Sequence, residues 1–127
     1  LDGACNPAAM RMITEFLLSR SPRDKTVAVA AMCCDKEVTE VLEILGNAAS
    51  RFIVTQIKNP RAMSARELAE QSPDTVEVTI EPEPLRAVEK AISMAGRDGL
   101  VIITGSLYLV GDVMKKYGKD TIENIFT

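Results

Sequence analysis

Histidine and tryptophan are absent from the 127 residues, and aromatic side chains are few, with three Phe and two Tyr. Without histidine, the chain lacks the commonest protein ligand of transition metals. The three cysteines are Cys5, Cys33 and Cys34, and this spacing fits neither a disulfide framework nor a zinc site. We therefore expect this chain to hold no metal and to work in a reducing, cytoplasmic compartment.

Long apolar runs and an excess of positive charge are also lacking. No run approaches the roughly 18 apolar residues of a membrane span, and we recognise no signal peptide. The 15 basic and 18 acidic residues are mixed along the chain and give a net charge of −3. A nucleic-acid binder normally carries a basic face with stacking aromatic rings. We therefore expect neither a membrane nor a nucleic acid as a partner.

Short β-branched runs alternate with stretches of helical period, which predicts one α/β domain with an aliphatic core. Strands are predicted over 25–32, 51–57, 75–81 and 100–104, and helices over 7–20, 35–49, from 64, from 84 to 96, and from 106. The first and last strand runs are almost wholly apolar, which predicts burial on both faces, while 75–81 alternates and is predicted to lie near an edge. The tail after Gly118 is expected to add a short helix or an edge strand.

This alternation predicts a Rossmann-like three-layer sandwich with helices on both faces of a mostly parallel sheet of about five to six strands. In such a sheet, the turns after the strands emerge at one edge, and ligands bind there. These turns hold the most polar residues of the chain: 2–6, 34–36, 59–61 and 104–107. Helices that begin at Pro7 and Ser106 would point their positive ends at this edge, which suits a phosphate or a carboxylate.

The same four turns resemble segments of one family. They read LDGACNP (1–7), CDKE (34–37), NPRA (59–62) and TGSLYLVG (104–111). In this order and roughly this spacing, they resemble the C-terminal domain of folylpolyglutamate synthases and dihydrofolate synthases, of the Mur ligase superfamily. The resemblance covers residues 1 to about 117. It predicts a Mur ligase-type C-terminal (glutamate ligase) domain over 1–127.

The resemblance implies an ATP-dependent acid–amino-acid ligase of folate biosynthesis. Such an enzyme activates the carboxylate of a folate or dihydropteroate as an acyl phosphate and joins it to the amine of L-glutamate. ATP and Mg²⁺ are required, and an N-terminal P-loop domain holds most of the Mg²⁺ ligands. The chain contains no G-x-x-G-K-[ST] loop and opens without Met, so we expect that domain to be a missing partner. By itself the chain is expected to contain no catalytic residue and to be inactive.

The resemblance also implies roles for single residues. Asp2 matches an aspartate that binds ATP through its ribose hydroxyls, although an Asp here also favours a turn. Cys5 stands where the family has histidine, and a thiol donates more weakly to phosphate or glutamate than an imidazole; a small turn residue is the alternative. Asn6 either caps the first helix or faces the ligand. Ser106 is expected to cap the last helix and to bind the glutamate α-carboxylate.

Three charged residues complete the expected edge. Asp35 is expected to cap the second helix. Lys36 and Arg61 are candidates to pair with glutamate or ATP, and solvated surface charge is the alternative. Two of the cysteines, Cys33 and Cys34, are interpreted as a core thiol and a turn residue.

Other classes stay open from the sequence. Another Mur-type ligase that adds a different amino acid would share this fold and chemistry. A freestanding flavodoxin-like or receiver-like binding module is an alternative from another class. Receivers need clustered acidic residues after their first strand and a phosphorylatable Asp after their third, and the turn after Ile57 offers Asn59 and Arg61 instead. A dinucleotide-binding oxidoreductase is disfavoured because no G-x-G-x-x-G follows a strand.

Overall fold

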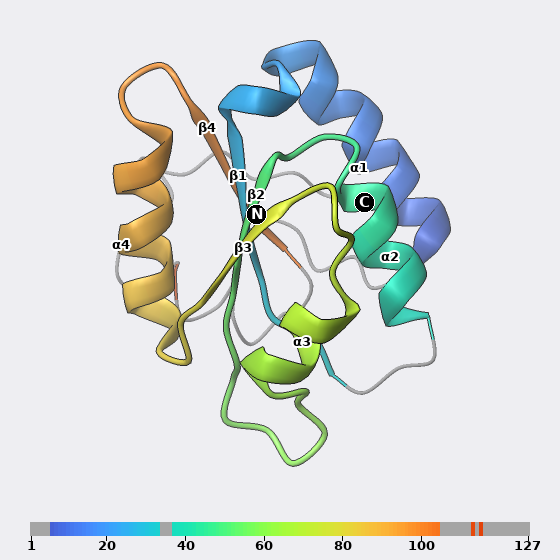
Figure 1. Cartoon of the computed structure of the whole chain (residues 1–127), viewed down its shortest axis with the longest axis vertical. Coiled ribbons are helices and arrows are strands. Elements are labelled where there is room, and N and C mark those ends of the chain that lie inside the picture. The colour runs from blue at the N-terminus through green and yellow to red at the C-terminus, as the bar shows by residue number, and fades with distance from the viewer. Residues whose placement is uncertain (1–5, 34–36, 105–112, 114, 116–127) are drawn as a thin grey trace.

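The computed structural model describes residues 6–33, 37–104, 113 and 115. Its strands are β1 (Thr26–Ala30), β2 (Arg51–Val54), β3 (Glu77–Ile80) and β4 (Leu100–Thr104). They form one sheet in the order β3-β2-β1-β4, and all neighbours are parallel. The helices are α1 (Pro7–Arg20), α2 (Val38–Leu45), α3 (Ala65–Gln71) and α4 (Pro84–Ala95), with a 3-10 turn, η1 (Arg23–Lys25), before β1 (Figure 1).

Hydrophobic side chains cover both faces of the sheet, because successive residues of a strand point to opposite faces. On one face lies a cluster shared with α1, α2 and α3, here called the three-helix cluster, which includes Met10, Leu42, Phe52, Leu68 and Ile102. On the other face lies the α4 cluster, which includes Val29, Ile53, Val88, Ile103 and Val113. The predicted three-layer α/β sandwich with helices on both faces is therefore confirmed.

The predicted number of strands, five to six, is wrong for the described residues, because their sheet has four strands. The described sequence up to Thr104 holds only four β-branched runs of strand length, and each of them forms a strand. A fifth strand was expected only from the tail after Gly118, and this tail lies outside the described residues. The pairing is parallel throughout the described sheet.

Burial differs between the middle and the edges of the sheet. The central strand β1 is fully buried, and β3 lies at an edge and is partly exposed, as its alternation predicts. The prediction of a fully buried last strand is wrong at its start, because Leu100 and Val101 are partly exposed. In the described sheet, β4 pairs with β1 alone, so its other side has no strand neighbour there.

The helix ends follow local sequence signals, with one exception. Pro7 begins α1, the Ser64 hydroxyl accepts the N–H of Glu67 at the start of α3, and Gly96 ends α4 with φ of 68°. The exception is α2, which was predicted to begin at Asp35 and to end near residue 49. It begins at Val38 and ends at Leu45, with Glu37 at the cap position and no side-chain cap.

The apolar pattern was misleading at the end of α2. Ala48 and Ala49 are buried, as in the predicted helix, but they lie in a turn whose N–H groups both donate to the carbonyl of Leu45. Asp35 itself lies outside the described residues. Among the helices of the described ranges, none is long and apolar enough to cross a membrane.

Candidate functional site

The carboxyl ends of the strands lie together at one edge of the sheet, the lower edge in Figure 1. The loop after β2 returns across this edge to the segment after β1. There the N–H of Met63 donates to the carbonyl of Met32 at 2.8 Å, and Cys33 forms an antiparallel bridge with Ala62. Since α1 leads upward through η1 into the start of β1, its first turn faces the same lower side. This is the edge that the sequence predicts to bind ligands.

Most of the predicted site residues lie outside the described part of the chain. They are Asp2, Cys5, Asp35, Lys36 and Ser106. Their neighbours Asn6, Glu37 and Thr104 are described. Met10 in α1 and Ile102 in β4 belong to the same three-helix cluster, so α1 covers the face of the sheet to which Ile102 points. The convergence of the first and last turns stays a prediction.

Asn6 acts as the cap of α1. Its side-chain Oδ1 accepts a hydrogen bond from the N–H of Ala9 at 2.8 Å, and Pro7 follows as the first helical residue. This satisfies one of the N–H groups that a helix start leaves without a partner. The capping interpretation of Asn6 is confirmed, and its contact with a ligand stays a prediction.

Arg61 projects from the turn that follows β2. Asn59 shapes this turn, because its Oδ1 accepts from the N–H of Arg61 at 2.8 Å and its carbonyl accepts from the N–H of Ala62 at 2.9 Å. The Arg61 side chain is exposed, and its guanidinium has no hydrogen-bond or ion-pair partner among the described residues. A cation held on a shaped turn at this edge is available to an anionic ligand.

Two threonine hydroxyls lie at this edge: Thr104 belongs to the predicted turn 104–107 but was assigned no role, and Thr55 was not predicted. Thr104 ends β4 and Thr55 directly follows β2; both are 0% exposed. Among the described residues, neither Oγ1 has a hydrogen-bond partner. Their backbones flank the end of β1, because Thr55 N–H donates to Ala30 at 2.9 Å and the Thr104 carbonyl accepts from Ala31 at 3.4 Å. Leaving a buried hydroxyl unpaired costs about 1–3 kcal/mol.

The one weak signal for these residues in the sequence is a threonine that ends an otherwise apolar strand run, in FIVT and LVIIT. Such a threonine is also common in ordinary strands, because its β-branched side chain suits a pleated sheet. Only the three-dimensional arrangement distinguishes these hydroxyls from bonded ones.

Charged residues at the turn after β3 form a structural ion pair. Lys90 lies 2.8 Å from Glu81, and the other carboxylate oxygen of Glu81 accepts from the N–H of Glu83. The hydrogen bond from Lys90 is the main reason that the pKa of the Glu81 carboxyl is lowered, and the bond from Glu83 lowers it further. The pair fixes the entry into α4, so Glu81 is held in its charged form by the fold.

A metal site is not found among the residues that the structure describes. Within these ranges, no group of three or more Asp, Glu or Cys side chains lies close enough to share an ion. Cys33 is free and partly buried, and it packs against the α4 cluster, in partial agreement with its interpretation as a core thiol.

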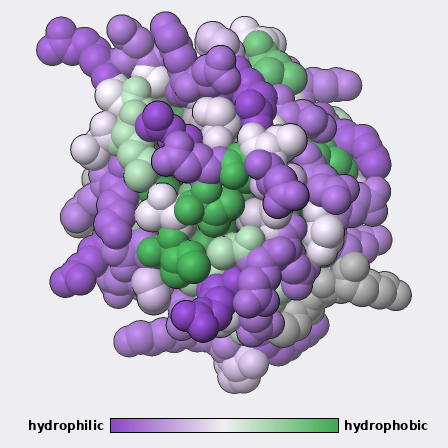
Figure 2. Space-filling view, viewed as in Figure 1, coloured by the Kyte–Doolittle hydropathy of each residue, from purple (hydrophilic) through white to green (hydrophobic). Residues whose placement is uncertain are grey.

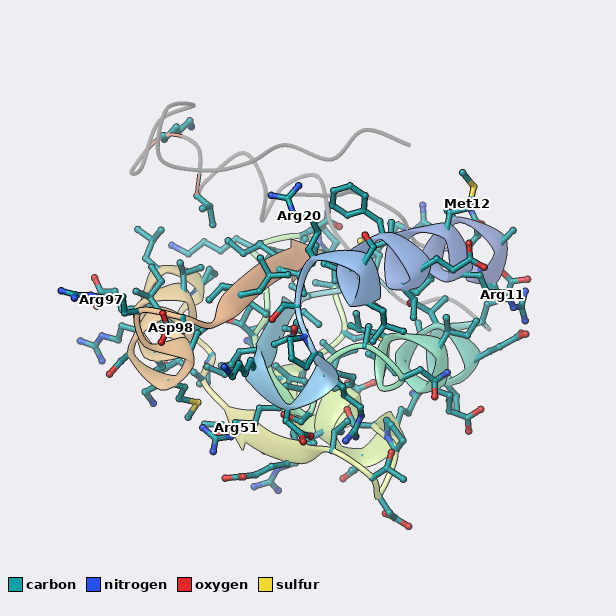
Figure 3. The ribbon with its side chains drawn as sticks, turned by 90° about the horizontal axis from the view of Figure 1, so that it is seen from above. Arg11, Met12, Arg20, Arg51, Arg97 and Asp98 are labelled. Carbon is teal, nitrogen blue, oxygen red and sulfur yellow. The ribbon has the colours of Figure 1, made fainter. Side chains whose placement is uncertain are left out.

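The opposite, amino-terminal edge of the sheet carries a bonded network. The guanidinium of Arg23 donates to the carbonyl of Gly46 at 2.8 Å and to that of Thr75 at 2.6 Å. The hydroxyl of Thr26 donates to Pro22 at 3.2 Å, and the N–H of Ser50 donates to the Arg23 carbonyl. Figure 3 looks onto this edge, where Arg97 and Asp98 mark the turn between α4 and β4.

The face of the molecule that Figure 2 shows is mostly polar. In the view of Figure 2, hydrophilic residues surround a small apolar group over the region of β3, where Ile80 is 46% exposed. Isolated apolar side chains of this kind are normal on a soluble domain. Within the described residues, the carboxyl edge is where the unpaired hydroxyls of Thr55 and Thr104 and the unpaired guanidinium of Arg61 occur together.

Comparison with known proteins gives the family context for this edge. Residues 1–107 match the family model for the Mur ligase, glutamate ligase domain. A dihydrofolate synthase/folylpolyglutamate synthase of Bacillus subtilis (strain 168) is 27% identical to this chain over 116 residues, which are 91% of this chain and 27% of that protein. These relatives are ligases.

Solved structures agree with this match. The bifunctional folylpolyglutamate synthase/dihydrofolate synthase of Yersinia pestis, complexed with AMPPNP and Mn ion, is 30% identical with a TM-score of 0.81, and the match covers 91% of this chain and 27% of that one. A structure of a bifunctional folylpolyglutamate synthase/dihydrofolate synthase with Mn, AMPPNP and L-glutamate bound is 28% identical with a TM-score of 0.78, at the same coverage. The chain therefore spans 27% of the length of these relatives.

Proposed function

The chain belongs to the Mur ligase family through its glutamate ligase domain, and on this premise we propose that it helps an ATP-dependent ligase to bind L-glutamate. The ligase joins this glutamate to a folate or to dihydropteroate, as a folylpolyglutamate synthase, a dihydrofolate synthase or both. The family match over residues 1–107 carries the proposal. The parallel sheet supports it, because three of the four segments that resemble the family follow strands in the sequence, and these strands end at one edge.

The chemistry has two steps. The carboxylate oxygen of the folate attacks the γ-phosphorus of ATP, so that ADP leaves and an acyl phosphate forms. The free amine of L-glutamate then attacks the carbonyl carbon, a C–N bond forms, phosphate leaves and the amine loses a proton. A divalent cation, Mg²⁺ in our proposal, would neutralise the phosphate charge. Because the described residues offer no set of three ligands, we place this ion in another domain and assign no step to a metal held here.

The residues of this chain bind and orient substrates in the proposal. Asp2 accepts hydrogen bonds from the ATP ribose hydroxyls. Cys5 and the start of α1 at Asn6 face the glutamate or phosphate anion, and Ser106 donates to the glutamate α-carboxylate. Support comes from the described neighbours, since the cap at Asn6 fixes the start of α1 and Arg61 adds positive charge at the carboxyl edge.

We further propose that residues 1–127 form the C-terminal domain of the enzyme, which closes over ATP held by a P-loop domain that precedes it. No phosphate loop occurs in the 127 residues, so this chain alone is expected to be inactive. A cytoplasmic location suits an enzyme that uses ATP and keeps free cysteines such as Cys33.

The test is glutamate incorporation by the complete gene product that carries this chain, compared with residues 1–127 alone. Radiolabelled L-glutamate is offered with ATP and either dihydropteroate or a reduced folate, and labelled product and ADP are measured. The complete product should ligate glutamate to at least one acceptor, and the 127 residues alone should not.

Parallel reactions with other amino acids separate this proposal from its alternative, a Mur-type ligase for another amino acid. The proposal fails if another amino acid is incorporated in preference to glutamate, or if the folded complete product incorporates none. Ligation by residues 1–127 alone would contradict the proposed division of labour between two domains.

A further inference from the structure

Four buried polar side chains in the described chain are threonines, and they differ in whether their hydroxyl is bonded. They are Thr14, Thr26, Thr55 and Thr104. Thr14 donates to the carbonyl of Ile44 at 3.4 Å and Thr26 donates to that of Pro22 at 3.2 Å. The hydroxyls of Thr55 and Thr104 have no partner within the part of the chain that the structure describes. Both unpaired hydroxyls lie at the carboxyl edge, and Thr26 lies at the amino edge.

The two unpaired hydroxyls point to opposite faces of the sheet. Thr104 is in register with Ala30, a member of the three-helix cluster, so its side chain points to the face covered by α1. Thr55 follows Val54 of that same cluster and therefore points to the α4 face. The two threonines do not converge on one ligand.

Thr104 is the one that adjoins a candidate substrate residue, Ser106, in the sequence. It directly precedes Gly105-Ser106, and α1, whose start is capped by Asn6, covers its face. A helix of 14 residues offers its positive end to an anion at this edge. The buried, unpaired hydroxyl is an independent observation, because valine has nearly the same shape and would avoid the cost of the unbonded group.

We propose that Thr104 is a substrate-binding residue whose hydroxyl donates a hydrogen bond to an anionic oxygen of a bound substrate. This inference rests on the proposed function. The oxygen belongs either to a carboxylate of L-glutamate or to a phosphate of ATP or the acyl phosphate. Because the side chain is fully buried, the carboxyl edge rearranges locally when substrate binds, and the hydroxyl gains its partner only then.

Four single variants of the complete gene product test this proposal. Thr104→Val removes the hydroxyl and keeps the shape, and Thr104→Ser keeps the hydroxyl. Thr55→Val is the matched control with an equally buried, unpaired hydroxyl on the other face. Thr26→Val is the control whose hydroxyl is bonded. Steady-state KM and kcat for glutamate and for ATP are measured, together with the urea midpoint of unfolding.

Thr104→Val is expected to raise one KM about tenfold, which is the loss of one hydrogen bond to a charged group, with a much smaller change in kcat. A higher KM for glutamate assigns the bond to a carboxylate, and a higher KM for ATP assigns it to a phosphate. Thr104→Ser should keep the original KM, and Thr55→Val should change neither KM. The urea midpoint of unfolding should rise in Thr104→Val and in Thr55→Val, and it should fall in Thr26→Val.

The proposal is overturned if Thr104→Val leaves both KM values unchanged in an active enzyme. That outcome would not affect the proposed function. It is also overturned if Thr104→Val lowers the urea midpoint as Thr26→Val does, because the hydroxyl would then be bonded without substrate. If the unsubstituted gene product ligates no glutamate, the proposed function fails, and this inference fails with it.

Discussion

The two edges of the sheet differ in whether their buried threonine hydroxyls are hydrogen-bonded. At the amino edge, the Arg23 guanidinium and the Thr26 hydroxyl donate to carbonyls of three different turns. At the carboxyl edge, two fully buried hydroxyls and the exposed Arg61 all lack a partner among the described residues. The comparison indicates that hydrogen bonding at the amino edge stabilises the fold, while at the carboxyl edge the Thr104 hydroxyl and the Arg61 guanidinium are available for ligands.

Arg23 stabilises the amino edge of the sheet through two hydrogen bonds. Its guanidinium joins η1 to the turn after α2, through Gly46, and to the segment before β3, through Thr75. Arginine presents several donors in a rigid planar fork, so one side chain can bond two carbonyls that are far apart in the sequence. Because these carbonyls belong to turns, the bonds also keep the starts of β2 and β3 in place beside β1.

The largest expected effect is a loss of activity from a change to a residue predicted to lie at the carboxyl edge. Asp2→Ala in the complete gene product should lower kcat/KM for ATP about a hundredfold, since two hydrogen bonds to a charged carboxylate are lost. The measurement is ATP-dependent glutamate incorporation. Asp24→Ala, which removes an exposed carboxylate at the amino edge, is the control and should change kcat/KM very little. Equal effects of the two variants would contradict the functional difference between the edges.

The next effect is on the amino side and concerns stability. Arg23→Met should lower the free energy of unfolding by about 2–3 kcal/mol, because the carbonyls of Gly46 and Thr75 lose their charged donor. Urea denaturation of the chain measures this change, with the exposed Arg97→Met on the same edge as control. KM for glutamate in the complete gene product should stay the same. A stable Arg23→Met protein with an altered KM would remove the distinction between the edges.

A smaller effect is expected at Cys5. Restoring histidine, with Cys5→His in the complete gene product, should lower the KM for glutamate about fivefold, because an imidazole donates a stronger hydrogen bond than a thiol. Cys5→Ser is the control for size and should keep a KM near that of the unsubstituted enzyme. An unchanged KM in Cys5→His would indicate that this position only fills the turn.

The smallest effect concerns pH. The pKa of Glu81 is lowered from 4.5, mainly by the hydrogen bond from Lys90, so its pairing stabilises the fold above about pH 4.5 and this contribution is lost as the pH falls through the folded pKa. Lys90→Met should therefore reduce the loss of stability between neutral and acidic pH. Unfolding midpoints at pH 7 and below pH 4.5 measure this, with the exposed Lys25→Met as control. An unchanged pH dependence would show that Lys90 does not set this titration.

Much of the fold follows from local signals in the sequence. The cap at Asn6, Pro7 at the first helical position and Gly96 at the end of α4 were predicted because each acts through its own backbone or that of near neighbours. The β-branched runs that form the four strands were recognised for the same reason. The start of α2 was misplaced because Asp35 was taken as its cap, whereas the helix begins at Val38 without a side-chain cap. Its end was misplaced because the apolar pattern continues beyond Leu45 to Ala48 and Ala49.

The rest depends on contacts that a local pattern cannot reveal. The partners of Arg23 lie 23 and 52 residues away along the chain, and the lack of a partner at Thr104 depends on everything packed around it. The candidate site was predicted as an edge, from the rule that strand ends of a parallel sheet lie together. Its assignment to glutamate came from the family resemblance, since the same edge could bind many anions.

The most direct test of the account is a crystal structure of the complete gene product with an ATP analogue and L-glutamate. We predict that L-glutamate lies at the carboxyl edge of this sheet, between the first turn of α1 and the end of β4. A glutamate bound at the amino edge beside Arg23, or wholly within another domain, would contradict the account.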